Sequence, residues 1–271
     1  MAPAFSAQFK ADHTAIMSVV AHNALDSAPL AIARYYQGSE SHVAWSNLLA
    51  SHISKTATEF GYNNLEHLAG KTGQTVTDAK RGAVDARVAQ HVARYVPSRT
   101  TDLMSSTAHL IVRELETRKQ ARQKAVKAAA VKDPPKPLVY TFDDMQFDLQ
   151  SIFDELGIDG ADYLADHESA SAGNAGMWAG AAGLGVGMEK VWYSVNDNKT
   201  RAWHAEMDGQ SVGLEEPFEV EGEMLMYPLD DSMGASAKNI YGCRCIIYYQ
   251  VAGTEEETAR RGLERLLLEM K

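Results

Sequence analysis

Apolar residues recur at helical spacing through the first half of the chain. Before Pro97, valine appears every four residues, at Val84, Val88, Val92 and Val96. This spacing lays an apolar stripe along one face of a helix. Pro97 then predicts the end of that helix. A second helix is predicted from about Asp102, with Thr101 as its N-cap.

A proline-rich segment separates this helical half from the rest. The letters DPPKP occupy residues 133–137, and adjacent prolines favour extended backbone that stops a helix. We therefore predict a helical arm or domain over 1–133 and a linker over 134–139. A compact domain is expected over 140–253, and a last helix, rich in leucine, over 254–271.

Helical spacing resumes directly after the linker. Thr141 and Asp144 are spaced as in a capping box, with Asp in place of the usual Glu. The apolar positions that follow fit one helix face, and Gly157 is well placed to end the helix. The small-residue stretch from 168 to 188 then predicts a short helix that leads into a loop, or close packing of backbones. Its glycines form no nucleotide-binding motif.

The pattern changes to strands and turns between residues 190 and 251. KVWYSV alternates, with Val191, Tyr193 and Val195 on one predicted face. NDNK and MDGQ are typical turns. EMLMYP predicts a short strand, and CRCIIYYQV predicts a buried strand. The expected fold class is α+β, with a helical N-terminal half followed by a small domain of short antiparallel strands.

Composition narrows the function classes. The formal net charge of the 271 residues is −10, which argues against DNA binding by the whole surface. Two cysteines are too few for a disulfide framework, so we expect a reducing compartment. The N-terminus has no secretory signal pattern, and no apolar run is long enough for a membrane span.

One basic stretch stands out in this acidic chain. It spans 113–132 and contains Arg113, Arg118, Lys119, Arg122, Lys124, Lys127 and Lys132. Such a run is typical of a solvated helix face, and it also fits contact with DNA or with an acidic partner.

The polar residues with chemical potential lie near the C-terminal end. Asp197, Arg201, His204 and Asp208 fall within twelve residues, and an Asp–His pair can act as a base and its orienting group. Cys243 and Cys245 are the only cysteines, and side chains two apart on a strand face the same way. With His204 and one Asp they could form a structural zinc site. Alternatively the cysteines are small buried residues, and Arg201 and Arg244 pair with Asp197 or Asp208.

The order of motifs after residue 189 resembles the phage head-morphogenesis family, also called the minor head protein family and typified by the F protein of phage Mu. The residues that carry the resemblance are Lys190, Trp192, Asp197, Arg201, His204, Asp208, Gly209, Phe218, Pro228, Asp230, Cys243, Arg244 and Cys245. Upstream, Glu168, Asn174 and Gly176 fit the family pattern, whereas Asp166 and His167 stand where an Arg-Thr pair is usual. The resemblance covers about residues 160–250.

The resemblance implies a phage structural protein without catalysis or cofactor. It would be a minor head component that is made in the host cytoplasm and built into the virion head in multiple copies. The implied partners are the portal protein or the major capsid protein, with packaged DNA as a further candidate through helix 113–132. The cysteine pair then belongs to a folding signature, and any metal would be structural.

Two alternatives stay open. An ADP-ribosyltransferase-like enzyme packaged with the virion would need a catalytic glutamate, for which Glu206 and Glu223 are candidates, but no Ser-Thr-Ser motif is present. A DNA-binding accessory protein would use the basic residues between Arg113 and Lys132 and would bind in a salt-dependent way.

Overall fold

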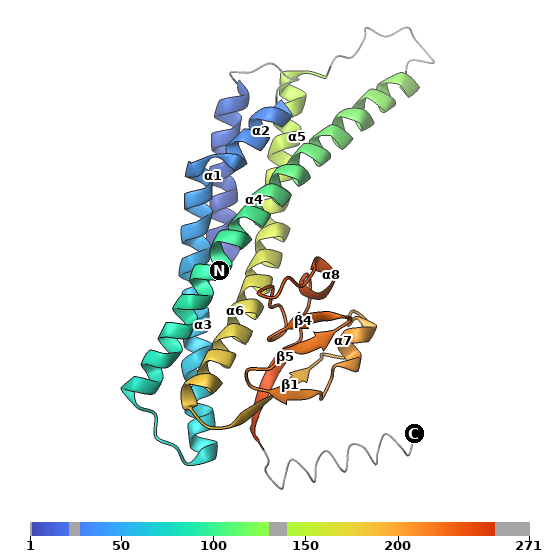
Figure 1. Cartoon of the computed structure of the whole chain (residues 1–271). Helices are drawn as coiled ribbons and strands as arrows, with labels where there is room; N and C mark the ends of the chain where they lie inside the picture. Colours follow the sequence, from blue (N-terminus) through green and yellow to red (C-terminus); the bar gives the residue numbers. More distant parts are fainter. Residues whose placement is uncertain (1, 22–27, 130–139, 253–271) are drawn as a thin grey trace. The chain divides into compact units, whose positions relative to one another are not determined.

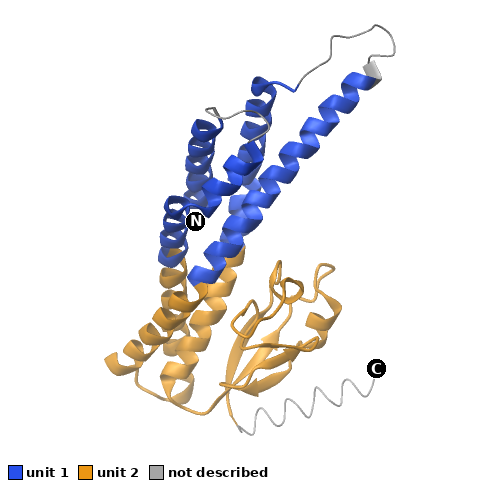
Figure 2. Cartoon of the chain, turned by 45° about the horizontal axis from the view of Figure 1, so that its top comes forward, with its two compact units in different colours: residues 1–51, 96–166 blue, residues 52–95, 167–271 orange. Residues whose placement is uncertain are grey.

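The computed structural model describes residues 2–21, 28–129 and 140–252, which divide into two compact units (Figures 1 and 2). Unit 1 comprises residues 1–51 and 96–166, and unit 2 comprises 52–95 and 167–271. Three helices, α3 (Ser39–Thr72), α4 (Asp78–Ala129) and α6 (Ala161–Leu184), contribute a part to each unit. The helical first half and the short antiparallel strands near the C-terminus confirm the predicted α+β class.

Within its described residues, unit 1 is built from helical segments. Besides parts of α3, α4 and α6, it contains α1 (Ala2–Ala21), α2 (Ala28–Gln37) and α5 (Phe142–Glu155), and α1 packs against both α2 and α5. Its core holds side chains that are at most 1% exposed, among them Phe5, Ile16, Ile32, Trp45 and Leu49. Asp12 is also fully buried, and it accepts hydrogen bonds from Trp45 Nε1 and from the Tyr35 hydroxyl, both at 2.9 Å.

The predicted helix break at Pro97 is wrong. Helix α4 runs without interruption from Asp78 to Ala129, with Pro97 inside it. Thr101 is not an N-cap, because its hydroxyl donates to the carbonyl of Pro97 at 3.0 Å, as a side chain does in mid-helix. The turns that follow Pro97 bury Thr100, Leu103 and Met104 in unit 1. This packing stabilises the helix enough to offset the loss of the backbone hydrogen bond that proline cannot donate.

The helix after the linker has the predicted start but a different end. The Thr141 side chain accepts from the backbone N–H of Asp144, and Asp144 accepts from the backbone N–H of Thr141, so the capping box is confirmed. Gly157 does not end the helical path. It lies in a π-helical turn, η2 (Leu156–Gly160), and α6 begins directly after it. Such a turn inserts an extra residue without breaking the helix.

The small-residue stretch lies largely inside the 24-residue helix α6, so the predicted helix was too short. The loop that follows covers only residues 185–187. The alternative prediction, close packing, is confirmed in unit 2. A β-carbon added to Gly176 would lie 2.2 Å from the carbonyl oxygen of Ala57, and one added to Gly180 would lie 2.3 Å from that of Gly61. Glycine therefore lets α6 approach the backbone of α3 more closely than any side chain would allow.

Two small antiparallel sheets complete unit 2. One has the order β2-β1-β5, with β1 (Met188–Tyr193) in the centre between β2 (Ser211–Gly213) and β5 (Ile246–Val251). The other pairs β3 (Phe218–Val220) with β4 (Glu223–Leu225). Two short helices, α7 (Ala202–Glu206) and α8 (Ala237–Ile240), lie in the connections. Strands β1, β4 and β5 overlap the predicted strands, whereas β2 and β3 were not predicted. The predicted strand CRCIIYYQV began too early, because β5 begins at Ile246, directly after Cys245.

The face of β1 that carries Val191 and Tyr193 is buried only in part. Val191 is buried, but Tyr193 and Val195 are 49% and 44% exposed. Lys190 and Trp192, which project to the opposite side from Val191, are both fully buried. The central strand is thus covered on both sides in its middle, and the alternation of apolar and polar letters does not report which face is inside.

Parts of the predicted domain division lie outside the described residues. The linker over 134–139 falls within 130–139, and the C-terminal helix over 254–271 falls within 253–271, so both stay predictions. Helix α5, which follows the linker, belongs to unit 1. Among the described helices, none combines the length and the apolar character that a bilayer crossing requires.

Candidate functional site

The main candidate site is a buried cluster of one imidazole and two thiols in unit 2. His204 Nδ1 lies 3.4 Å from Cys243 Sγ and 3.6 Å from Cys245 Sγ. All three donor atoms lie within 4.8 Å of one another, and none of the three residues is more than 5% exposed. The two cysteines form no disulfide. Imidazole nitrogen and cysteine sulfur are the donors that zinc prefers in proteins.

The elements around the cluster fix its imidazole. His204 lies on α7, which begins after the turn at residues 197–200, where the Thr200 N–H donates to the Asp197 carbonyl. Trp192 of β1 packs edge-on against the imidazole, with ring centroids 5.6 Å apart. The Ser194 hydroxyl donates to the carbonyl of His204 and also lies 3.4 Å from Cys245 Sγ. Ring and backbone of His204 are thus held from two sides.

Asn239 determines which nitrogen of His204 carries hydrogen. Its amide nitrogen donates to the Val220 carbonyl at 3.1 Å and to Glu223 Oε2 at 2.8 Å. Its amide oxygen must therefore be the atom that faces His204 Nε2, at 3.2 Å. An oxygen can only accept, so Nε2 bears the hydrogen. In the neutral imidazole the lone pair then lies on Nδ1, toward the two sulfurs.

The two thiols do not share their proton equally. The hydrogen bond from Cys243 lowers the pKa of the Cys245 thiol to about 4, although burial opposes this shift. Donation of the same hydrogen bond, together with burial, raises the pKa of Cys243 far above its ordinary value. Cys245 is therefore the sulfur that becomes a thiolate first, and a thiolate is the form that binds metal or attacks an electrophile.

An ion pair lies beside the cluster. Arg244 makes two parallel hydrogen bonds to the carboxylate of Asp197, at 2.7 and 2.6 Å, which confirms one of the predicted pairings. The pair lowers the pKa of Asp197 well below its ordinary value. Arg201 does not join it, because its guanidinium donates to the carbonyl of Tyr241. Both arginines therefore hold the chain segment around the cysteines.

Lys190, Trp192 and Phe218 form the packed centre beside the cluster. Trp192 and Phe218 meet edge to face at 5.4 Å, and the Lys190 ammonium lies 5.4 Å from the Phe218 ring. Lys190 donates to the carbonyl of Met226 at 2.6 Å, and burial lowers the pKa of its amine to about 8. Lys190 therefore joins β1 to the turn that follows β4, and the hydrogen bond offsets part of the cost of its burial.

The remaining motif residues stabilise turns. Asp208 accepts from the Ser194 N–H at 2.8 Å, and Gly209 has a positive φ of 78° that favours glycine. Asp230 is 2% exposed and accepts from the Met226 N–H at 3.0 Å. The Pro228 carbonyl accepts from the Asn174 side chain at 3.0 Å. The structure thus uses these residues to hold the backbone of unit 2.

Asn174 links helix α6 to the strand that follows the cysteines. Its amide nitrogen also donates to the Cys245 carbonyl at 3.2 Å, and its oxygen accepts from the Ile247 N–H at 3.3 Å. Glu168, upstream on the same helix, is fully buried and accepts from the Tyr95 hydroxyl at 3.1 Å. The three upstream residues of the resemblance, Glu168, Asn174 and Gly176, all act in packing or hydrogen bonding inside unit 2.

Sequence reasoning missed Asn239 and Ser194. Asn239 directly precedes the segment with the cysteines, and a lone asparagine carries no motif signal. Ser194 is the residue before the last in the predicted strand KVWYSV. A search for buried side-chain amides near the cysteines could have named Asn239, but its burial comes from the fold.

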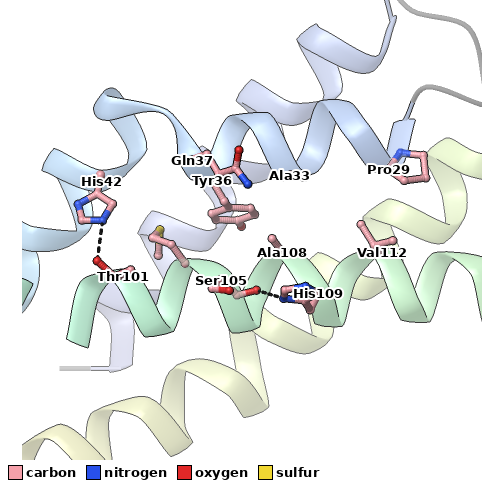
Figure 3. Close-up of a pocket in the computed structure, with 11 residues that line it drawn as sticks. Pro29, Ala33, Tyr36, Gln37, His42, Thr101, Ser105, Ala108, His109 and Val112 are labelled. Atoms are coloured by element: carbon pink, nitrogen blue, oxygen red, sulfur yellow. Dashed lines mark hydrogen bonds between the residues drawn. The ribbon is translucent and has the colours of Figure 1, made fainter. Parts of the chain in front are cut away.

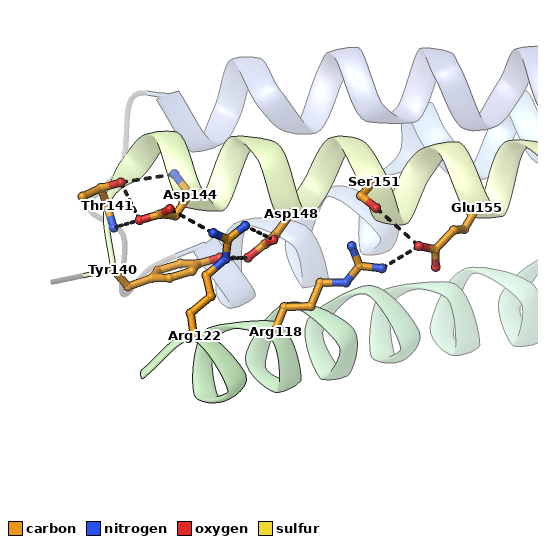
Figure 4. Close-up of polar contacts among 8 residues, drawn as sticks. All are labelled: Arg118, Arg122, Tyr140, Thr141, Asp144, Asp148, Ser151 and Glu155. Atoms are coloured by element: carbon orange, nitrogen blue, oxygen red, sulfur yellow. Dashed lines mark hydrogen bonds and ion pairs between the residues drawn. The ribbon is translucent and has the colours of Figure 1, made fainter. Parts of the chain in front are cut away.

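The basic stretch lies on α4 in unit 1 and is partly neutralised by α5 (Figure 4). Arg122 donates to Asp148 at 2.7 and 3.1 Å and to Asp144 at 3.2 Å, and Arg118 donates to Glu155 at 2.7 Å. Lys124 and Lys127 are exposed, and Lys132 lies outside the described residues. The arginines thus serve helix packing, which leaves fewer charges for a phosphate backbone.

Unit 1 also contains a groove of about 530 Å³ beside α2 and α4 (Figure 3). Its lining is mostly apolar and includes Pro29, Ala33, Tyr36, Met104, Ala108 and Val112. Two histidines border it: His42 Nε2 lies 3.3 Å from the Thr101 hydroxyl, and His109 Nδ1 lies 2.8 Å from the Ser105 carbonyl. The groove offers an apolar hollow, and the chemically reactive side chains lie in unit 2.

Comparison with known proteins assigns the segment that contains the thiol–imidazole cluster. Residues 154–248 match the family described as "Phage Mu protein F like protein". The resemblance predicted from the motifs is confirmed for this F-like segment. The match indicates a phage head-related protein.

A curated relative also shares sequence with the chain. It is the NAD(+)–arginine ADP-ribosyltransferase EFV of Enterococcus faecalis, which is 29% identical over 88 residues. The match covers 32% of this chain and 18% of the relative. The chain therefore spans a small part of the length of that relative. No solved structure matches the chain.

Proposed function

We propose that this chain is a minor head protein that acts near the portal in head assembly, DNA packaging or ejection. Support comes from the match of residues 154–248 to the Phage Mu F-like family. The proposal places the protein in the host cytoplasm during assembly and then in the virion head, in several copies. The portal protein or the major capsid protein would be its direct partner.

The geometry of the F-like segment fits a structural role. The side chains of Lys190, Asp208 and Asp230 form hydrogen bonds with backbone atoms of unit 2. A catalytic centre instead directs such groups toward a substrate. The family's motif residues therefore support a rigid module, and a rigid module suits a protein that must present one surface to a large assembly.

Quantitative mass spectrometry of gradient-purified particles tests the proposal. The phage that carries this gene is grown with and without a nonsense mutation in it, and protein amounts are compared with the major capsid protein. We expect a low copy number in wild-type particles and defective or empty heads in the mutant. Normal, infectious particles without the protein would contradict a role in the head.

The similarity to an ADP-ribosyltransferase supports a second candidate, an enzyme carried by the virion. Of the two candidate glutamates, Glu223 accepts from the Ser236 N–H and from Asn239 Nδ2, both at 2.8 Å, and the hydrogen bonds from Ser236 lower its pKa. Glu206 is exposed at the end of α7. Glu206 is therefore the better placed to meet a substrate.

NAD hydrolysis by the purified chain separates the two candidates. If the chain is a structural protein, NAD stays intact with the wild type and with the Glu206→Gln variant alike. The enzyme would be favoured if the wild type hydrolyses NAD and the Glu206→Gln variant does not. The control is Glu219→Gln, on the exposed side of β3, which should keep the activity. The same preparation is then tested for transfer of the ADP-ribose group to arginine.

Contact with packaged DNA is a further proposal for the basic part of α4. Its exposed cations include Lys124 and Lys127. If they contact phosphates, affinity should fall as salt rises, and the double variant Lys124→Gln/Lys127→Gln should have a shallower salt slope. The matched control is Lys55→Gln/Lys71→Gln on α3. Equal slopes for wild type and variant would remove DNA from the list of partners.

A further inference from the structure

We propose that His204, Cys243 and Cys245 form a zinc site in which the chain supplies three ligands and leaves the fourth position open. The argument starts from distances. Zinc lies about 2.0–2.1 Å from a histidine nitrogen and about 2.3 Å from a cysteine sulfur, in tetrahedral geometry. These values place a nitrogen and a sulfur ligand about 3.6 Å apart. The observed separations from Nδ1 are 3.4 and 3.6 Å.

The protonation of the imidazole fits the same ion. The Asn239 amide oxygen holds the hydrogen on His204 Nε2, which leaves the Nδ1 lone pair directed at the sulfurs. Histidines that bind metals usually donate their other N–H to an oxygen in this manner. Asn239 also accepts from Trp203 Nε1 at 2.7 Å, so its position is fixed by several bonds. The ligand orientation is therefore built before an ion arrives.

Charge balance favours a divalent ion in this place. The three residues are each at most 5% exposed. Two thiolates buried together would be costly, whereas two thiolates with one Zn²⁺ carry no net charge. Thiolate ligands select soft or borderline metals, and two sulfurs with one imidazole are typical of zinc. Magnesium and calcium, which prefer oxygen ligands, do not fit this donor set.

The fourth position faces a recess. A hollow of about 10 Å³ is lined by all three ligands and by Thr200, Arg201 and Arg244. This volume is close to the space that one water molecule requires. The ion would therefore hold a water there. An open fourth position distinguishes this arrangement from a closed structural site.

The site would join segments that are far apart in sequence. His204 lies on α7, and the cysteines lie 39 and 41 residues later, just before β5. Because the ligands come together only in the folded chain, binding of the ion adds directly to folding stability. This property goes beyond the proposed head function and holds for either candidate function.

Metal binding to the whole wild-type chain is the test. The protein is purified with a thiol reductant, stripped with a chelator, and titrated with Zn²⁺ and separately with Co²⁺. Co²⁺ reports sulfur ligands through charge-transfer absorption and tetrahedral geometry through its visible bands. We expect saturation at about one ion per chain, with both spectral features. Absence of binding and of charge-transfer absorption, with both thiols shown to be reduced, would overturn the proposal.

Variants locate the ion. Cys243→Ser and Cys245→Ser should each weaken zinc binding and reduce the cobalt charge-transfer band, and His204→Gln should weaken binding while the band remains detectable. Asp197→Asn is the control, because it removes the ion pair with Arg244 and leaves all three ligands. Unchanged affinity in a folded cysteine variant would assign the ion to another place and contradict the site. The wild-type titration decides the question if the variants do not fold.

Discussion

The Asn239 amide oxygen lies 3.2 Å from His204 Nε2, and the Asn239 amide nitrogen is bonded on its other side to Val220 and Glu223. Asn239, which is not one of the family's motif residues, therefore orients the motif residue His204. It also links α8, which carries Asn239, to α7. The orientation of the imidazole therefore depends on a residue that has no reactive group of its own.

Replacement of Asn239 should weaken zinc binding without removing a ligand. In Asn239→Ala the His204 ring loses the acceptor that holds hydrogen on Nε2, and we expect the zinc affinity to fall about 10- to 100-fold. Competition with a chromophoric chelator measures the change. Asn63→Ala, at an exposed position in the middle of α3, is the control. Equal affinities for the two variants would contradict an orienting role for Asn239.

The close approach of α6 to α3 gives a second prediction. Gly176→Ala places a methyl group 2.2 Å from the Ala57 carbonyl oxygen, and backbone cannot move aside as a flexible side chain can. We expect a loss of about 3 kcal/mol in unfolding free energy. Gly70→Ala on α3 is the control, because nothing lies within 4 Å of the added carbon. That control should gain about 0.5–1 kcal/mol, as alanine favours helix over glycine. Denaturant unfolding measures both, and equal stabilities would show that the helices can separate at no cost.

Arg122 tests whether the basic stretch serves helix packing. Asp148, its main partner, has a side chain that is 4% exposed, and Arg122→Gln leaves that carboxylate with the Tyr140 hydroxyl at 2.9 Å as a remaining donor. We expect a loss of about 1–2 kcal/mol, since Arg122 itself is partly exposed. Arg113→Gln, whose side chain is 68% exposed, should change stability little. Similar melting temperatures for the two variants would leave the stretch available for DNA.

Local patterns predicted the elements that depend on neighbouring residues. The capping box at Thr141 required a few adjacent letters and proved correct. The predicted strand CRCIIYYQV proved correct from Ile246 onward, whereas Cys243 and Cys245 precede β5. The break at Pro97 failed because burial of Thr100, Leu103 and Met104 holds the helix together, and burial is a property of the whole fold. The glycines of α6 were ambiguous for a similar reason. A glycine that permits close packing and a glycine that loosens a loop look the same in sequence.

The sequence predicted three ligands of the candidate site, but it did not predict the residues that surround them. His204, Cys243 and Cys245 were named together because their side chains suit zinc, and the structure brings their donor atoms within 4.8 Å. The predicted fourth ligand, an aspartate, is not among them. Asp197 is held by Arg244, and Asp208 bonds to Ser194 and Asn196. Sequence spacing cannot show which partner each aspartate takes, because the fold brings together residues that are far apart in sequence, such as Asp197 and Arg244.

His91 gives a pH-dependent prediction. It lies in unit 2 with its Nδ1 3.3 Å from the Tyr227 hydroxyl, and burial lowers its pKa from 6.5 to about 4, with Arg94 as a further cause. Between pH 6.5 and 4 the unfolded chain binds a proton at this residue and the folded chain does not. The stability that the neutral His91 contributes is therefore fully present above pH 6.5, and the unfolding free energy decreases as pH falls toward 4.

The His91→Gln variant should remove this dependence, because glutamine keeps an acceptor for Tyr227 and does not titrate. We expect the difference between wild type and variant to change by about 3 kcal/mol from pH 7 to pH 4. His67→Gln, at an exposed histidine on α3, is the control for the replacement of a histidine by glutamine. Denaturant unfolding at several pH values measures the three curves, and the subtraction cancels the carboxylates that titrate in the same range. Parallel curves for wild type and His91→Gln would mean that the buried imidazole accepts a proton in the folded state as readily as in the unfolded chain.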